Sequence, residues 1–191
     1  KEFIEKIKDD CIFKLPTKNC DFNLVIPVRD KLNFTDSLFE IITDASNKVS
    51  EDICLTIVEH SDRPNHSKWC KKNGVNYIYV PCDLGEEINI PLCFNLGGLY
   101  SVSSKYHIFY EGTNVFMTSD FFKDIIDNNI NTNCFIRTSL FDCGFEITKG
   151  LINGSVKMGD LDMKTFGIDR SEEVFGNFPF VASEFFSEHK Y

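Results

Sequence analysis

The chain alternates between short runs of apolar, β-prone residues and longer segments in which apolar residues recur every three or four positions. Continuous apolar runs are typical of strands buried on both faces of a sheet, and the spacing of three and four is typical of amphipathic helices. The runs predict strands at 22–28, 53–58, 76–80 and 106–110.

Helices are predicted between these strands. Thr35 can cap the first, the second follows Pro64 and ends at Asn73–Gly74, and Pro91 can open the third. Strands that alternate with helices over short connections form a parallel, doubly wound sheet. The predicted fold class is therefore α/β, with a mostly parallel central sheet flanked by helices.

The two ends of the chain are less regular. Residues 1–20 predict a short amphipathic helix followed by a polar connector, and residues 115–191 predict a helix near 119–126 and a strand pair at 135–140 and 144–147. We find no linker and no internal repeat. The whole chain, 1–191, is therefore predicted to form one domain.

Composition and charge exclude several classes of protein. Of the 191 residues 42% are hydrophobic and 19 are Phe, which suits a globular domain with a real core. The net charge of −9 leaves no broad basic surface for duplex nucleic acid. The apolar runs are far shorter than the roughly 20 residues of a membrane span, so no transmembrane segment is predicted.

The cysteines bear on the compartment. All eight are scattered and none forms a C-x-x-C pair, which favours free thiols and a reducing, cytoplasmic environment. No signal peptide is visible, but the chain begins at Lys1, so a leader or anchor could have been removed. In that case a secretory lumen is possible, and three N-x-S/T sequons would become relevant.

Polar and ionisable residues follow every predicted strand, at 27–30, 59–62, 81–83 and 111–114. Ligands of doubly wound sheets bind beyond the carboxyl ends of the strands. An Arg there can contact phosphate, and carboxylates can hold a metal or a base edge. We expect Arg29 and Glu59 to line one cleft, with Arg29 on a diphosphate and Glu59 on a metal or a base edge. The alternative is that these residues are ordinary solvated turns.

Several segments together resemble one family. The segments are Val25–Asp30, Ile57–Asp62, Ile88–Gly97, and Ile152–Gly154 followed by Gly159–Met163. In order and spacing they resemble the nucleotide-sugar glycosyltransferases of the GT-A fold, particularly the galactosyltransferase-like and family 2 enzymes. The resemblance implies a Rossmann-like GT-A domain, with a nucleotide-binding half at 1–114 and an acceptor-side half at 115–191.

The resemblance also implies an activity. A sugar would pass from a uridine-linked nucleotide-diphosphate donor to a hydroxyl of a glycan, protein or lipid. The resemblance implies that Glu59 accepts the imide proton of the donor's uracil. The implied catalytic base is Asp160. The implied substrate-binding residues are Pro27, Val28, Arg29, Glu59 and Asp162. The implied ligands of a divalent cation, Mn²⁺ or Mg²⁺, are Glu111 and Thr113.

One departure from the family keeps other functions open. The family's Asp-x-Asp motif after the fourth strand is replaced by Glu111-Gly112-Thr113, which retains one carboxylate and exchanges the other for a hydroxyl. A module that has lost catalysis and serves in binding or assembly is therefore the main alternative. A nucleotidyltransferase is a third possibility, but the Gly-rich loop expected after its first strand is missing.

Overall fold

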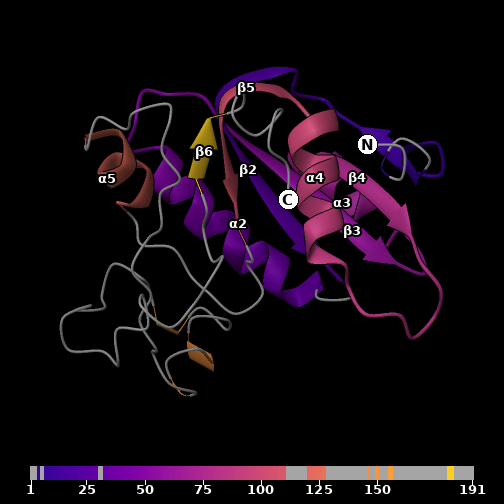
Figure 1. Ribbon diagram of the computed structural model, residues 1–191. Helices are drawn as coiled ribbons and strands as arrows, with labels where there is room; N and C mark the ends of the chain where they lie inside the picture. The colour runs from indigo at the N-terminus through magenta and orange to yellow at the C-terminus, as the bar shows by residue number, and fades with distance from the viewer. Residues whose placement is uncertain are drawn as a thin grey trace, which may run out of the picture.

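The computed structural model describes residues 4, 7–29, 32–110, 120–127, 146, 149–150, 155–156 and 180–182 (Figure 1). Its strands are β1 (Ile12–Lys14), β2 (Asn19–Val28), β3 (Ile53–Ser61), β4 (Asn76–Pro81), β5 (Ser103–Phe109) and β6 (Phe180–Ala182). Its helices are α2 (Leu32–Ser46), α3 (Ser67–Asn73), α4 (Ile90–Tyr100) and α5 (Phe121–Asp127). None of the helices in these described ranges has the length and apolar content needed to cross a bilayer.

The strands form one sheet in the order β1-β4-β3-β2-β5-β6. The inner strands β4, β3, β2 and β5 are parallel, and β1 and β6 pair antiparallel with the two ends of this group. The chain moves from β2 through β3 to β4 in one direction and then returns to place β5 on the other side of β2. The prediction of an α/β fold with a mostly parallel sheet flanked by helices is confirmed.

This reversal places helices on both faces of the sheet. Right-handed crossovers require the helix of a returning connection to lie on the opposite face from the earlier helices. Accordingly, α2 and α3 pack on one face and α4 on the other, where it lies in front of the sheet in Figure 1. Alternate residues of β2 serve the two cores: Leu24 and Ile26 face α2, and Val25 faces α4.

Local signals explain several helix boundaries. Asn89 caps α4 by accepting the backbone N–H of Leu92 at 3.0 Å, and Pro91 stands in the first turn, where a missing N–H costs nothing. The predicted end of α3 is confirmed, because Gly74 adopts the left-handed conformation (φ 67°) that suits glycine at a helix end. Helix α2 begins at Leu32, upstream of the predicted cap Thr35.

The structure differs from the sequence prediction at the two edges of the sheet. Residues Ile12–Lys14, predicted as part of a polar connector, form β1, and Phe180–Ala182 form β6 next to β5. Both strands are three residues long, too short to show a period. The predicted strand pair in 135–147 lies outside the described residues except for Glu146, which is helical and contradicts the second strand.

Pro27 lies in a central strand without interrupting it. In a parallel ladder alternate residues hydrogen bond to opposite neighbours. Val25 bonds toward β5, since its carbonyl accepts the N–H of Tyr110 at 2.9 Å, and Pro27 has the same orientation two residues later. The register with β5 ends at Val25, whereas β2 stays paired with β3 through Val28. An N–H at position 27 would point toward β5 beyond the last paired residue. Pro27 therefore costs the sheet no hydrogen bond.

A buried polar cluster joins three strands to the end of α4. Asn23 Oδ1 accepts the Thr56 hydroxyl at 2.7 Å, and its Nδ2 donates to Ser101 Oγ at 2.8 Å and reaches His107 Nδ1 at 3.3 Å. Because Asn23 supplies an N–H, His107 Nδ1 must be the acceptor. Asn23, Thr56 and His107 are buried, so these bonds satisfy polar groups that water cannot reach.

Helix α4 approaches the sheet most closely at Gly97. A Cβ on this residue would lie 2.2 Å from Cγ1 of Val25 and 3.1 Å from Cγ2 of Val58. We expect Gly97→Ala to destabilise the fold by about 1–3 kcal/mol, because the side chains it meets are held inside the core. Urea unfolding followed by circular dichroism measures this loss.

The matched test of this contact is a double-mutant cycle. Val25→Ala removes the methyl group that the new Cβ would strike, so the double variant should be more stable than the sum of the two single effects predicts. Additive losses would show that Val25 is not what excludes a side chain at position 97.

Candidate functional site at the carboxyl edge of the sheet

The carboxyl ends of β2, β3 and β4 meet at one edge of the sheet. The chain reverses its winding at β2, which has β3 on one side and β5 on the other. In open α/β sheets this switch point is where ligands bind. The register of β2 with β5 ends at Val25, before Pro27 and Arg29.

Arg29 follows β2 directly and is half-buried. Burial lowers the pKa of His60 at the end of β3, and the positive charge of Arg29 adds to this; burial raises the pKa of Cys82 after β4, and Arg29 opposes it. The guanidinium thus lies close to the ends of the neighbouring strands. The other two predicted substrate-binding residues of this segment, Pro27 and Val28, are buried in β2, and Val28 is part of the core under α2.

His60 is 7% exposed and stands on the α4 side of β3, as Val58 does two residues earlier. Its Nδ1 accepts the backbone N–H of Asn89, the cap of α4, at 3.3 Å. The net pKa of His60 is lowered: burial is the main cause, the Glu86 carboxylate opposes it, and Arg29 adds to it. His60 is therefore a neutral, oriented imidazole.

Cys82 continues this edge after β4, where its backbone N–H donates to the carbonyl of Ser61 at 3.2 Å. Burial is the main cause that raises the pKa of its thiol, so the sulfur is protonated and a poor nucleophile at neutral pH. The other described cysteines, Cys11, Cys20, Cys54, Cys70 and Cys93, are also free thiols, in line with the prediction for the residues that the structure covers.

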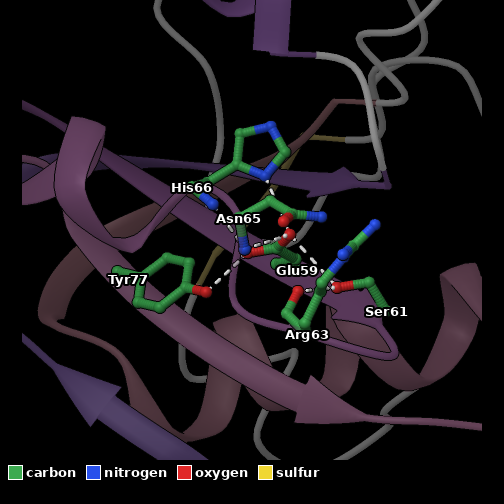
Figure 2. Close-up of polar contacts among 6 residues, drawn as sticks. All are labelled: Glu59, Ser61, Arg63, Asn65, His66 and Tyr77. Atoms are coloured by element: carbon green, nitrogen blue, oxygen red, sulfur yellow. Dashed lines mark hydrogen bonds and ion pairs between the residues drawn. The ribbon is translucent and has the colours of Figure 1, made fainter.

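Glu59 points to the other side of β3, toward α3, and is fully buried (Figure 2). Oε2 accepts the Tyr77 hydroxyl at 2.5 Å and the backbone N–H of His66 at 3.0 Å. Oε1 accepts the backbone N–H of Asn65 at 3.0 Å, and the Ser61 hydroxyl lies 3.1 Å away. The carboxylate thus ties the β3–α3 connection to the end of β3 and to β4.

The surroundings of Glu59 favour its charged form. Burial alone would raise the pKa of Glu59, but contacts with His66 and Tyr77 outweigh it and hold the pKa below the ordinary value. His66 Nδ1 lies 3.0 Å from Oε1 without the alignment of a hydrogen bond, and His66 Nε2 is buried with no hydrogen-bond partner among the residues that the structure describes. Burial and the bond to Glu59 raise the pKa of Tyr77.

Arg29 and Glu59 were expected to line one cleft, and the structure separates them. The register pairs Val28 with Glu59, and both face the α2–α3 side, whereas Arg29 acts on His60 on the α4 side. A uracil that bound Glu59 would have to displace one of the donors that the chain itself supplies. His60 was missed as a site residue because its role depends on the contact with Asn89, 29 residues away in sequence.

The remaining predicted site residues lie outside the described ranges. These are the proposed base Asp160, its neighbour Asp162, and the proposed metal ligands Glu111 and Thr113. Within the ranges that are described, no group of three or more His, Cys, Asp or Glu side chains is arranged to hold a metal ion. The metal prediction therefore depends on residues 111–113.

Comparison with known proteins does not identify the chain: no family model matches it, and no curated protein matches its sequence. The function has to be argued from the fold and from the residues at the edge of the sheet.

Proposed function

We propose that the protein is a glycosyltransferase that binds a uridine-linked nucleotide-diphosphate sugar beyond the carboxyl ends of β2, β3 and β5. The observation that carries the proposal is the reversal of strand order at β2 with Arg29 directly behind that strand. A guanidinium is well suited to a diphosphate because its fork of donors matches phosphate oxygens. The antiparallel β6 beside β5 is compatible with the GT-A variant of this fold.

The proposed chemistry needs residues from both halves of the chain. Arg29 offsets negative charge on the departing nucleotide diphosphate, and a divalent cation held by Glu111 and Thr113 would supply further positive charge. Asp160 removes the proton of the acceptor hydroxyl as that oxygen attacks the anomeric carbon. Asp162 contributes to substrate binding.

A module without catalysis is the second candidate, and the bonding of Glu59 favours it. The carboxylate proposed to recognise uracil already accepts hydrogen bonds from Tyr77 and from the backbone of Asn65 and His66. The replacement of Asp-x-Asp by Glu111-Gly112-Thr113 points in the same direction. Such a module would keep the edge of the sheet as a binding or assembly surface and transfer no sugar.

Thermal unfolding with a panel of nucleotides and nucleotide sugars, with and without Mn²⁺, tests the proposal. A ligand at about 100 times its dissociation constant adds about 2.7 kcal/mol to stability, which is easily seen as a melting shift. The glycosyltransferase should be stabilised by a nucleotide sugar and should release its nucleotide when an acceptor is supplied. Binding without sugar transfer or donor hydrolysis would support the module, and no stabilisation by any nucleotide would contradict the proposed function.

We expect Arg29→Ala to weaken UDP binding by about ten- to a hundredfold, because it removes a charge-assisted contact to phosphate. Isothermal titration calorimetry measures the change. Arg63→Ala is the matched control, since Arg63 lies in the exposed turn after β3 and its removal should leave the affinity for UDP nearly unchanged. Equal affinities of the Arg29→Ala and unaltered proteins for UDP would show that Arg29 does not contact the phosphates.

A further inference from the structure

His60 presents a single hydrogen-bond donor at the carboxyl edge of the sheet. Neutral imidazole carries its proton on one nitrogen, and Nδ1 is occupied as the acceptor of the Asn89 N–H. The proton therefore resides on Nε2. The contact with Asn89, which begins α4, also fixes the plane of the ring.

This donor is not used by the part of the protein that the structure describes. No hydrogen bond of His60 other than that from Asn89 is made with any of the described residues. The side chain is nevertheless more than nine-tenths buried. Nε2 is not among the described side-chain atoms that are both buried and without a partner, so it reaches the surface, where water or a ligand can accept its hydrogen.

The charges around His60 indicate which ligand would fit. Arg29 and His60 are the next residues after the register pair Val28–Glu59, so the two parallel strands set a cation beside a neutral N–H donor. This pair complements an anion, whose charge the guanidinium offsets and whose oxygen accepts the imidazole hydrogen. The Glu86 carboxylate also acts on His60, in the opposite sense to Arg29.

We propose that His60 is a positioning residue for the nucleoside diphosphate, donating from Nε2 to a phosphate oxygen of the group whose charge Arg29 neutralises. The inference rests on the proposed function, since it assigns a second contact to the same ligand. His60 takes no part in proton transfer, because its only proton is held in the hydrogen bond to the ligand and its other nitrogen is occupied by Asn89.

Two amide variants separate the two ring nitrogens. His60→Gln can place an amide N–H near the position of Nε2, whereas His60→Asn can accept the Asn89 N–H near the position of Nδ1 and has no donor at Nε2. For UDP we expect His60→Asn to lose about tenfold in affinity and His60→Gln to stay within about threefold of the unaltered protein. For uridine, which has no phosphate, we expect the same affinity in all three proteins. Calorimetry supplies the affinities, and melting temperatures confirm folding.

A second measurement uses the unaltered protein and does not depend on the folding of a variant. In ¹⁵N spectra of protein labelled at histidine, UDP should shift the Nε2 resonance of His60, and uridine should not. His60 is assigned by comparison with the His60→Gln spectrum.

The outcomes distinguish this inference from the proposed function. Full UDP affinity in His60→Asn, equal losses for UDP and uridine, or an unmoved Nε2 resonance would each overturn the role of His60. In those cases a loss of UDP affinity in Arg29→Ala would still support the proposed function. No binding of UDP by the unaltered protein would overturn both.

Discussion

The Glu59→Ala variant is expected to lose about 3–5 kcal/mol of folding stability, because removing one member of a buried charged network leaves its partners without compensation. The Tyr77 hydroxyl and the backbone N–H of His66 would lose their acceptor inside the protein, and the backbone N–H of Asn65 would keep only the carbonyl of Arg63. A loss of this size is a large part of the stability of an ordinary domain. Urea unfolding followed by the fluorescence of Trp69, the single tryptophan, measures it.

Two further variants control for the loss of the carboxylate itself. Tyr77→Phe removes one donor and keeps the anion, so it should cost about 1.5–3 kcal/mol, less than Glu59→Ala. Glu40→Ala removes an exposed carboxylate of α2 and should change stability by no more than about 0.5 kcal/mol. If Glu59→Ala behaved like Glu40→Ala, the network around Glu59 would not hold the β3–α3 connection.

The stability of the protein is expected to fall as the pH is lowered through the range in which His107 titrates. Burial lowers the pKa of His107 from 6.5 to about 4. The unfolded chain therefore binds a proton below about pH 6.5, while the folded protein resists it down to about pH 4. The contribution is fully present above pH 6.5, declines between 6.5 and 4 and amounts to about 3 kcal/mol in total.

The His107→Asn variant isolates the contribution of His107 to the pH dependence of folding stability. Its amide oxygen can still accept the N–H of Asn23, but it has no proton to take up in this range. Urea unfolding at about pH 7 and about pH 4 should show a loss of stability that is smaller in His107→Asn by about 3 kcal/mol. His60, whose pKa is also lowered, acts in the same direction in both proteins and cancels from the difference. Equal pH dependence of the two proteins would contradict the assignment.

Both predictions concern residues whose importance the sequence shows only in part. Glu59 and His107 each stand in an apolar run, and a charged or polar residue inside a buried strand is a sign of a special environment. The sequence could not supply their partners. Tyr77 is 18 residues from Glu59, and Asn23 is 84 residues from His107, so both contacts arise only when the strands pair.

The sequence by itself determined the parallel sheet, because buried parallel strands and amphipathic helices leave local periods that short windows reveal. Strands β2, β3, β4 and β5 and the end of α3 at Gly74 were all predicted in this way. It also indicated that the carboxyl ends of the parallel strands meet at one edge of the sheet, where we predict that a ligand binds. These properties follow from the order of residues along a single element.

Only the tertiary structure decided on which face of the sheet each residue at that edge lies and what it contacts there. Successive residues of a strand point to opposite faces, so Glu59 and His60, adjacent in sequence, are divided between the α3 core and the α4 side. The same holds for β1 and β6, whose three residues become strands only because β4 and β5 offer free edges to them. Local periodicity records which residues share a face, and the partners that cover each face are supplied by segments far away in the chain.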